Sequence, residues 1–209
     1  STASLNGALK IMGKGSARDR TYNGDFVITG RNVEVQGLPI RTIDAHLQVA
    51  DNQAQFSQLE VIFDDKNSIR GGGNIQLVEP FDYGASFDVQ LKDLSFLQPL
   101  LDYEAFPPKL GGSLQLTWQG KGDLRAPEHT GNALVELTAG QFGDLKDLSA
   151  RATASYSPQF INVPELRASA GSFGEAMLSL FWKDNRLSLS NLSVRQNKLM
   201  LLQGSAEIP

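Results

Sequence analysis

The sequence contains no cysteine among its 209 residues and only two histidines. Disulfide bonds and thiolate metal sites are therefore excluded, and a zinc site is not expected because the histidines do not have ligand spacing. The charged residues, 19 basic and 23 acidic, are scattered along the chain without a block of one sign. Since nucleic-acid binding normally requires a clustered basic surface, we expect no nucleic-acid partner.

Long hydrophobic runs are also missing. The longest aliphatic run, residues 199–202, is far shorter than the roughly 20 residues that a membrane-spanning helix needs. No basic and apolar leader opens the chain, and it ends at Pro209 in the middle of a strand-like pattern. We therefore interpret the chain as a segment of a longer polypeptide, with any anchor or signal outside it.

Motifs for catalysis or cofactor binding are equally scarce. Residues 171–174 lack the spacing of a Gly-x-Ser-x-Gly elbow, and residues 71–73 are not followed by the third glycine of a dinucleotide loop, which favours a bulge or hairpin there. Asp64 and Asp65 lack further acids at alternate positions, which predicts a solvated loop. His46, on the polar side of a strand, and His129, beside a turn, are expected at the surface. We expect no enzyme activity, no metal and no cofactor.

What the sequence does contain is alternation with period two. In residues 83–91, Tyr83, Phe87 and Val89 alternate with polar residues, and residues 43–49, 114–119 and 176–183 repeat this pattern. Successive side chains of a strand point to opposite faces, so each segment has one apolar and one polar side. Clean alternation is typical of an antiparallel sheet with one solvated face.

Turn residues separate these segments. They fall at residues 22–24, 36–37, 50–52, 64–67, 71–73, 111–112 and 183–185. The spacing predicts an all-β fold of about 14–16 short strands in an elongated, curled antiparallel sheet, a half-pipe with an apolar groove. Residues 95–104 differ, because Leu94, Leu97 and Leu101 have helical spacing with Asp93 or Ser95 as N-cap. We expect one short helix there that caps an apolar end of the sheet.

A tandem repeat of about 105 residues is also present. Leu5, Gly7, Leu9 and Ile11 recur as Leu110, Gly112, Leu114 and Leu116. The repeat predicts two continuous β-units, residues 1–108 and 109–209, and fades beyond about residue 161. A repeated β-unit favours an elongated, stacked architecture over an enzyme with a pocket.

A sheet of about fifteen strands would extend roughly 70 Å, which is too long to stay flat. It must form two packed layers or curl around its apolar side, and the small residues at positions 150, 152, 154, 168 and 170 favour the curled form. An open apolar face of about 1,000 Å² would cost about 25 kcal/mol in water, so we expect it to hold an apolar guest such as acyl chains. The predicted groove residues are Leu9, Ile11, Phe26, Ile28, Val33, Val35, Ile43, Leu47, Val49, Val61, Phe63, Ile75, Leu77, Phe87, Val89, Leu91, Leu114, Leu116, Trp118, Val135, Leu178, Leu180 and Trp182.

Two neighbouring segments of the chain resemble a repeat of the TamB/AsmA-like proteins. The first is residues 110–127, with the pattern Leu-Gly-Gly-Ser-Leu-Gln-Leu-Thr-Trp followed by Gly-Asp-Leu-Arg-Ala-Pro, and the second is residues 130–137, Thr-Gly-Asn-Ala-Leu-Val-Glu-Leu. Residues 145–152 resemble the following strand of that family. Residues 13–18 have the glycines but lack the Leu and Pro of the pattern. The resemblance extends over most of the chain.

This resemblance implies a bridge across the periplasm of a diderm bacterium, anchored in the inner membrane through the parent protein. Its taco-shaped sheet would conduct phospholipid to the outer membrane and support outer-membrane protein assembly, with a barrel of the Omp85 class as partner. The cut edges of an excised sheet would also allow edge-to-edge self-association.

Two alternatives remain open at this point. Trp118 and Trp182, expected at strand ends on the apolar side, would stack sugars in a carbohydrate-binding β-sandwich, although a packed aromatic near the rim of the sheet explains them better. A structural spacer or adhesin segment with a closed core is the other alternative.

Overall fold

The computed structural model describes residues 5–18, 21–35, 37–101, 108–126, 128–197 and 199–208. These residues form thirteen strands and two short 3₁₀ helices, η1 (Leu94–Leu100) and η2 (Gly171–Phe173). The strands are β1 (Leu5–Arg18), β2 (Thr21–Val35), β3 (Leu38–Ala50), β4 (Gln53–Ile62), β5 (Asn67–Gln76), β6 (Asp82–Leu91), β7 (Leu110–Asp123), β8 (His129–Phe142), β9 (Leu145–Ser157), β10 (Phe160–Ala170), β11 (Glu175–Lys183), β12 (Arg186–Gln196) and β13 (Leu199–Ile208).

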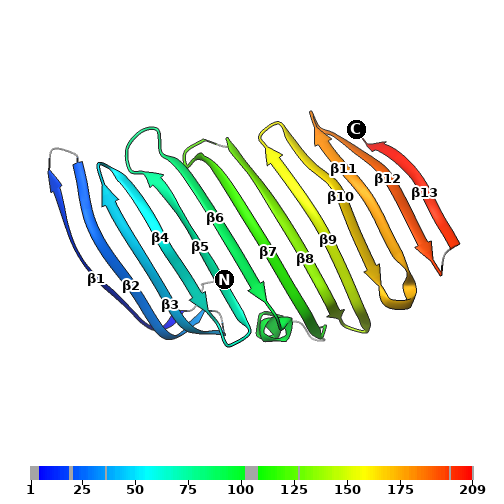
Figure 1. Ribbon diagram of the computed structural model, residues 1–209, viewed down its shortest axis with the longest axis horizontal. Coiled ribbons are helices and arrows are strands. Elements are labelled where there is room, and N and C mark those ends of the chain that lie inside the picture. Colours follow the sequence, from blue (N-terminus) through cyan, green and yellow to red (C-terminus); the bar gives the residue numbers. More distant parts are fainter. Residues whose placement is uncertain are drawn as a thin grey trace.

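All thirteen strands belong to one antiparallel sheet in which each strand pairs with the next along the chain. Figure 1 shows an elongated row from β1 to β13 that bends along its length and does not close. The predicted all-β, curled and open sheet is therefore confirmed. Since β6 pairs with β7, the sheet continues through the expected unit boundary at residues 108–109.

The strands are fewer and longer than expected, because several glycine-rich segments lie inside strands rather than between them. Residues 22–24 belong to β2, residues 71–73 to β5 and residues 111–112 to β7, so the turns predicted there are wrong. Gly72 instead lies opposite a bulge in β4, between Phe56 and Leu59. The expected turns at residues 51–52, 64–66 and 184–185 are confirmed.

The predicted helix is present as η1, but it is a 3₁₀ helix, and its expected residues 102–104 lie outside the described part of the chain. Asp93 is the N-cap, and its side chain accepts a hydrogen bond from the Ser95 amide. Pro99 lies in the last turn of η1. The helix contacts β3 and β7, and the Phe96 ring packs 5.1 Å from that of Phe63, just after β4, so η1 covers one end of the sheet.

Asn67 connects η1 to the β4–β5 turn. Its side chain is buried, with 1% exposed, and it donates a hydrogen bond of 2.7 Å to Asp64. The carbonyl oxygen of the same side chain accepts the Asp93 amide at 3.2 Å. Lys66 pairs with Asp93 at 2.9 Å. The two aspartates predicted in a solvated loop thus have structural partners, because Asp65 also pairs with Arg41.

The 105-residue repeat has a counterpart in the backbone. Strands β1 and β7 both have 14 residues, and β3 and β9 both have 13. Gly7 and Gly112 both have positive φ, 111° and 93°, and each coincides with a shift of register toward the next strand. Positive φ is accessible to glycine without steric cost, which explains why this residue recurs at this point of the unit.

The chain exposes 13,789 Å² of surface. A compact monomer of 22.7 kDa would expose about 9,500 Å². Among the described residues, the buried apolar side chains are Val33, Ile40, Ala45, Ala54 and Leu91. The large surface and the small core follow from a sheet without a second layer.

Candidate functional site

Cross-strand register gathers the apolar side chains on one face of the sheet, here called the apolar face. Residues directly opposite each other in an antiparallel pair point to the same face, so the register traces rows across the strands. One row runs without a polar residue from β3 to β11 and is called the aliphatic row. It consists of Ile43, Val61, Ile69, Val89, Leu116, Val135, Ala152, Leu166 and Leu178.

A second row of the apolar face combines large rings with small residues. It joins Leu59, Gly71, Phe87, Trp118 and Ala133. The Phe87 and Trp118 rings stack with centroids 5.6 Å apart and planes inclined by 22°.

Aromatic rings lie over the glycines of the apolar face. A Cβ added to Gly71 would lie 2.5 Å from the Phe87 ring, and one added to Gly120 would lie 2.5 Å from Trp118. The same relation holds between Gly24 and Phe26, at 2.5 Å. These rings cover the glycine backbone at positions where the strand has no side chain of its own.

Polar atoms of the apolar face are paired with one another. The Tyr83 hydroxyl lies 3.1 Å from Nδ1 of His129, whose ring is 5.7 Å away. The Trp118 indole donates to Tyr156 at 3.2 Å. Burial raises the pKa of Tyr83, and the neighbouring Tyr156 adds to this effect. The sequence suggested that His129 lies at the surface beside a turn. In the structure its side chain belongs to the apolar face.

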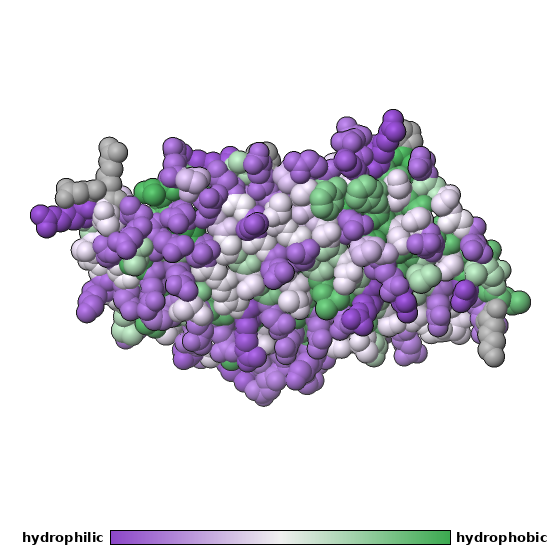
Figure 2. Space-filling view, turned by 45° about the horizontal axis from the view of Figure 1, so that its top comes forward, coloured by the Kyte–Doolittle hydropathy of each residue, from purple (hydrophilic) through white to green (hydrophobic). Residues whose placement is uncertain are grey.

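The opposite face, here called the polar face, carries the charged pairs. Glu60 and Arg70 are directly opposite on β4 and β5 and form an ion pair of 2.6 Å, and Glu136 pairs with Arg151 at 3.0 Å. His46 also lies here, 2.9 Å from Asp25. Figure 2 shows a side of the molecule on which hydrophilic residues predominate, with hydrophobic groups toward the C-terminal strands.

The register places the predicted groove residues of the strands on the apolar face, and their exposure differs widely. Val33 and Leu91 are buried, with 2% and 7% exposed, so the protein itself already covers them. Leu9 and Ile11 are 47% and 66% exposed because β1 is an edge strand. Most of the others are partly exposed.

Three predicted positions differ in detail. Phe63 and Leu77 lie just beyond the ends of β4 and β5, in the turns. Trp118 lies in the interior of β7 rather than at its end, because the strand continues through two further glycines to Asp123. Trp182 is next to the last residue of β11, as expected.

Further residues of the apolar face were missed by the sequence pattern. Bulges shift the alternation by one residue, so Phe56 and Leu59 both reach this face although their spacing is odd. The same holds for Val163 and Leu166, on either side of a bulge in β10. The sequence does contain a signal for such bulges: within one apolar segment, the alternation of apolar and polar residues shifts by one position.

No group of three or more His, Asp or Glu residues in the described part of the chain is placed to hold a metal ion. In the same residues, no helix is both long enough and apolar enough to span a membrane.

The candidate site is therefore the extended wall of apolar contacts on the apolar face. Comparisons of the chain with models of protein families, with curated proteins and with solved structures gave no match.

Proposed function

We propose that this chain is a segment of a periplasmic bridge that holds and conducts phospholipid acyl chains along its apolar face. The observation that carries the proposal is a single-layered sheet whose apolar face has no second layer in the described residues, apart from η1 at one end. A large exposed apolar face on a protein normally contacts a partner molecule.

The geometry of the aliphatic row suits an acyl chain. The row crosses nine strands, which are about 4.8 Å apart, so it extends for about 38 Å. One leaflet of a bilayer core is about 15 Å thick, so the row accommodates two acyl chains end to end. Since each CH₂ group removed from water contributes about 0.8 kcal/mol, such a row retains lipid without any polar contact.

Movement along the row needs no catalytic group. Ile69, Val89 and Leu116 offer similar aliphatic contacts on successive strands, so a sliding chain exchanges one contact for an equivalent one. The charged headgroup would stay in water at the open rim, because burying it would cost several kcal/mol.

The resemblance to TamB/AsmA-like proteins supports the wider setting of the proposal. In that setting the parent protein is anchored in the inner membrane, the segment lies in the periplasm, and an Omp85-class barrel is the outer-membrane partner. Exposed Leu199 and Leu201 on the edge strand β13 favour edge-to-edge association of the isolated segment. The filled two-layer core that a β-sandwich or a closed spacer would have is not the observed architecture.

The test is photo-crosslinking of lipid at one position on each face of the sheet. A photo-reactive amino acid replaces Phe87 on the apolar face, or Gln90 on the polar face of the same strand, in the parent protein in cells. We expect phospholipid adducts at Phe87 only, together with phospholipid in an organic extract of the purified segment. Equal labelling at both positions, or an extract without phospholipid, would overturn the proposal.

A further inference from the structure

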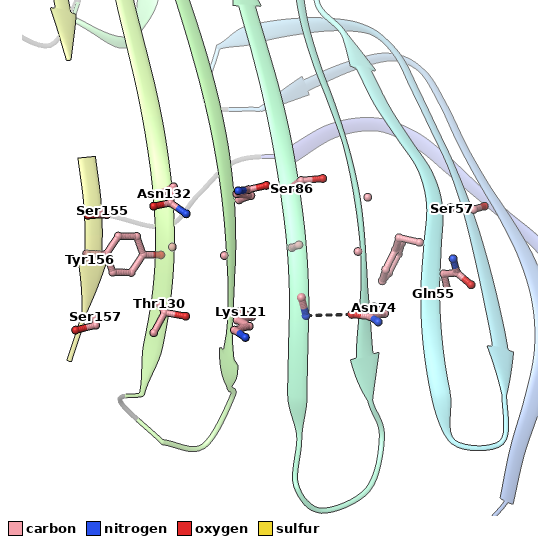
Figure 3. A pocket seen from close by; sticks show the side chains of 18 of the residues that line it. Gln55, Ser57, Asn74, Ser86, Lys121, Thr130, Asn132, Ser155, Tyr156 and Ser157 are labelled. Carbon is pink, nitrogen blue, oxygen red and sulfur yellow. Dashed lines mark hydrogen bonds between the residues drawn. The ribbon is translucent and has the colours of Figure 1, made fainter. Parts of the chain in front are cut away.

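A hollow of 920 Å³ is lined mainly by residues of the polar face, together with Phe56 and Tyr156, whose positions in the register belong to the apolar face. It crosses β4 to β10, and Figure 3 shows Lys121, Thr130 and Asn132 on neighbouring strands around it. Gly72 and Gly84, which have no side chains, form part of its lining. The hollow exists because small residues of the central strands lie between larger polar ones.

The polar side chains of the hollow form rows across the strands. Ser86, Gln119, Asn132 and Ser155 are consecutive partners on β6 to β9. Lys121 and Thr130 are partners in the next row of the same face. A linear ligand lying across the strands would meet a new pair of polar groups about every 4.8 Å, close to the length of one sugar unit.

Four polar side chains in the middle of the hollow have no hydrogen-bond partner within the described part of the protein. Gln119, Lys121, Asn132 and Ser155 form no side-chain hydrogen bond or ion pair in the described structure, whereas Asn74 at the rim accepts the Gly84 amide at 3.1 Å. Their donors and acceptors are therefore available to a ligand without breaking internal bonds, which lowers the free-energy cost of binding.

The chemistry of the lining selects the class of ligand. Among the described residues that line the hollow, Lys121 is the only charged one, and none carries a carboxylate. Amides and hydroxyls both donate and accept, which matches the hydroxyl groups of a sugar. A polyanion would require more cations than one lysine.

An aromatic surface completes the hollow at the β10 side. Phe160 lines it, and its ring stacks on that of Phe181 with centroids 6.2 Å apart. Phe181 is 41% exposed, so the pair presents ring surface to water. The C–H face of a pyranose packs on such a surface, while its hydroxyls reach the polar rows.

We propose that this hollow binds a neutral oligosaccharide that lies across β6 to β9, with Gln119 and Asn132 as its central hydrogen-bonding residues and Phe160 as a stacking surface. The proposal is independent of lipid binding, since Gln119, Asn132 and Phe160 lie on the face opposite to the aliphatic row.

The test is titration of the protein with cellohexaose, maltohexaose and chitohexaose, followed by NMR of the side-chain amides. We expect at least one of them to bind with a Kd of about 1 mM or tighter and to shift the Gln119 and Asn132 signals. Asn132→Ala and Phe160→Ala should each weaken binding about tenfold.

Two controls keep the test specific. Gln48→Ala changes an exposed amide outside the hollow and should leave binding unchanged. No shift with any of the three sugars, or binding of heparin that Lys121→Gln abolishes, would overturn the proposal. Phe87→Arg on the apolar face should not affect sugar binding.

Discussion

The indole Nε1 of Trp118 donates a hydrogen bond to the hydroxyl oxygen of Tyr156 at 3.2 Å. Trp118 lies on β7 and Tyr156 on β9, so the bond passes over β8. Tyr156 lies opposite Gly131, where an added Cβ would come within 2.8 Å of the tyrosine ring. A glycine on the middle strand thus allows two aromatic side chains to connect three strands of a sheet that has no second layer.

Replacing one of the glycines beneath the rings, even by alanine, should therefore destabilise the protein. In Gly120→Ala, the new Cβ would lie 2.5 Å from Trp118 and 2.9 Å from the carbonyl oxygen of Thr130. We expect a loss of about 1–3 kcal/mol in the free energy of unfolding, although alanine normally stabilises a strand relative to glycine. Guanidinium unfolding followed by Trp118 emission in a Trp182→Phe background measures this loss.

The matched control is Gly204→Ala on β13, where no atom lies within 4 Å of the new Cβ. This change should be neutral or slightly stabilising. Equal losses at Gly120 and Gly204 would show that the rings do not depend on the glycine.

Charge on the apolar face should block lipid while charge on the polar face should not. Phe87→Arg and Leu116→Arg place a guanidinium among the aliphatic and aromatic rows, so an acyl chain would have to displace or dehydrate it. We expect at least a tenfold decrease in co-purified phospholipid, measured by mass spectrometry of extracts.

Thr117→Arg and Gln90→Arg are the controls, because both positions face the opposite side of the same strands. They should retain phospholipid at the native level. Phe87→Leu, which keeps the wall apolar, checks that loss of the ring alone does not explain the effect.

Asn67 should be the most sensitive polar residue of the η1 end. In Asn67→Ala, the Asp93 amide loses its acceptor, and Asp64 loses a donor at 2.7 Å. Because the site is buried, we expect a loss of about 2–3 kcal/mol in the free energy of unfolding. Urea unfolding with comparison of m-values measures it, and Gln48→Ala, which is exposed, should change stability by less than about 0.5 kcal/mol.

Asp93 should make part of the stability depend on pH. Hydrogen bonds from the Ser95 hydroxyl, from Lys66 and from the Ser95 amide lower the pKa of Asp93 from 3.8 to about 2. The folded state therefore holds this proton less tightly than the unfolded state, so the stabilisation is complete above pH 3.8 and is lost as the pH falls to about 2. Since a third of the side chain is exposed, we expect about 1 kcal/mol or less.

Urea unfolding at several pH values tests this sign. Asp93→Asn should be less stable than the native chain at pH 7, and the difference should shrink as the pH falls from about 4 to 2. Asp82→Asn, which changes an exposed carboxylate without an ion pair, should show no such trend. A difference for Asp93→Asn that is constant with pH would contradict the assignment.

Period-two alternation by itself determined that this chain forms an antiparallel sheet with one apolar face. Val89, Leu116 and Leu178 could be assigned to that face from sequence because each lies in an uninterrupted alternating segment. The helix near residue 95 was also readable, since Asp93 precedes apolar residues at helical spacing.

Only the tertiary structure decided three features: on which side of a bulge each apolar residue changes face, how exposed each side chain is, and how many layers the fold has. Phe56 and Leu59 share a face because a bulge, which depends on the partner strand, inserts one residue between them. Val33 is buried and Ile11 is exposed although both are apolar strand residues, because exposure depends on the neighbours that the fold brings near. Alternation states which side of a strand is apolar; what lies against that side depends on contacts between distant parts of the chain, and local pattern carries no information about them.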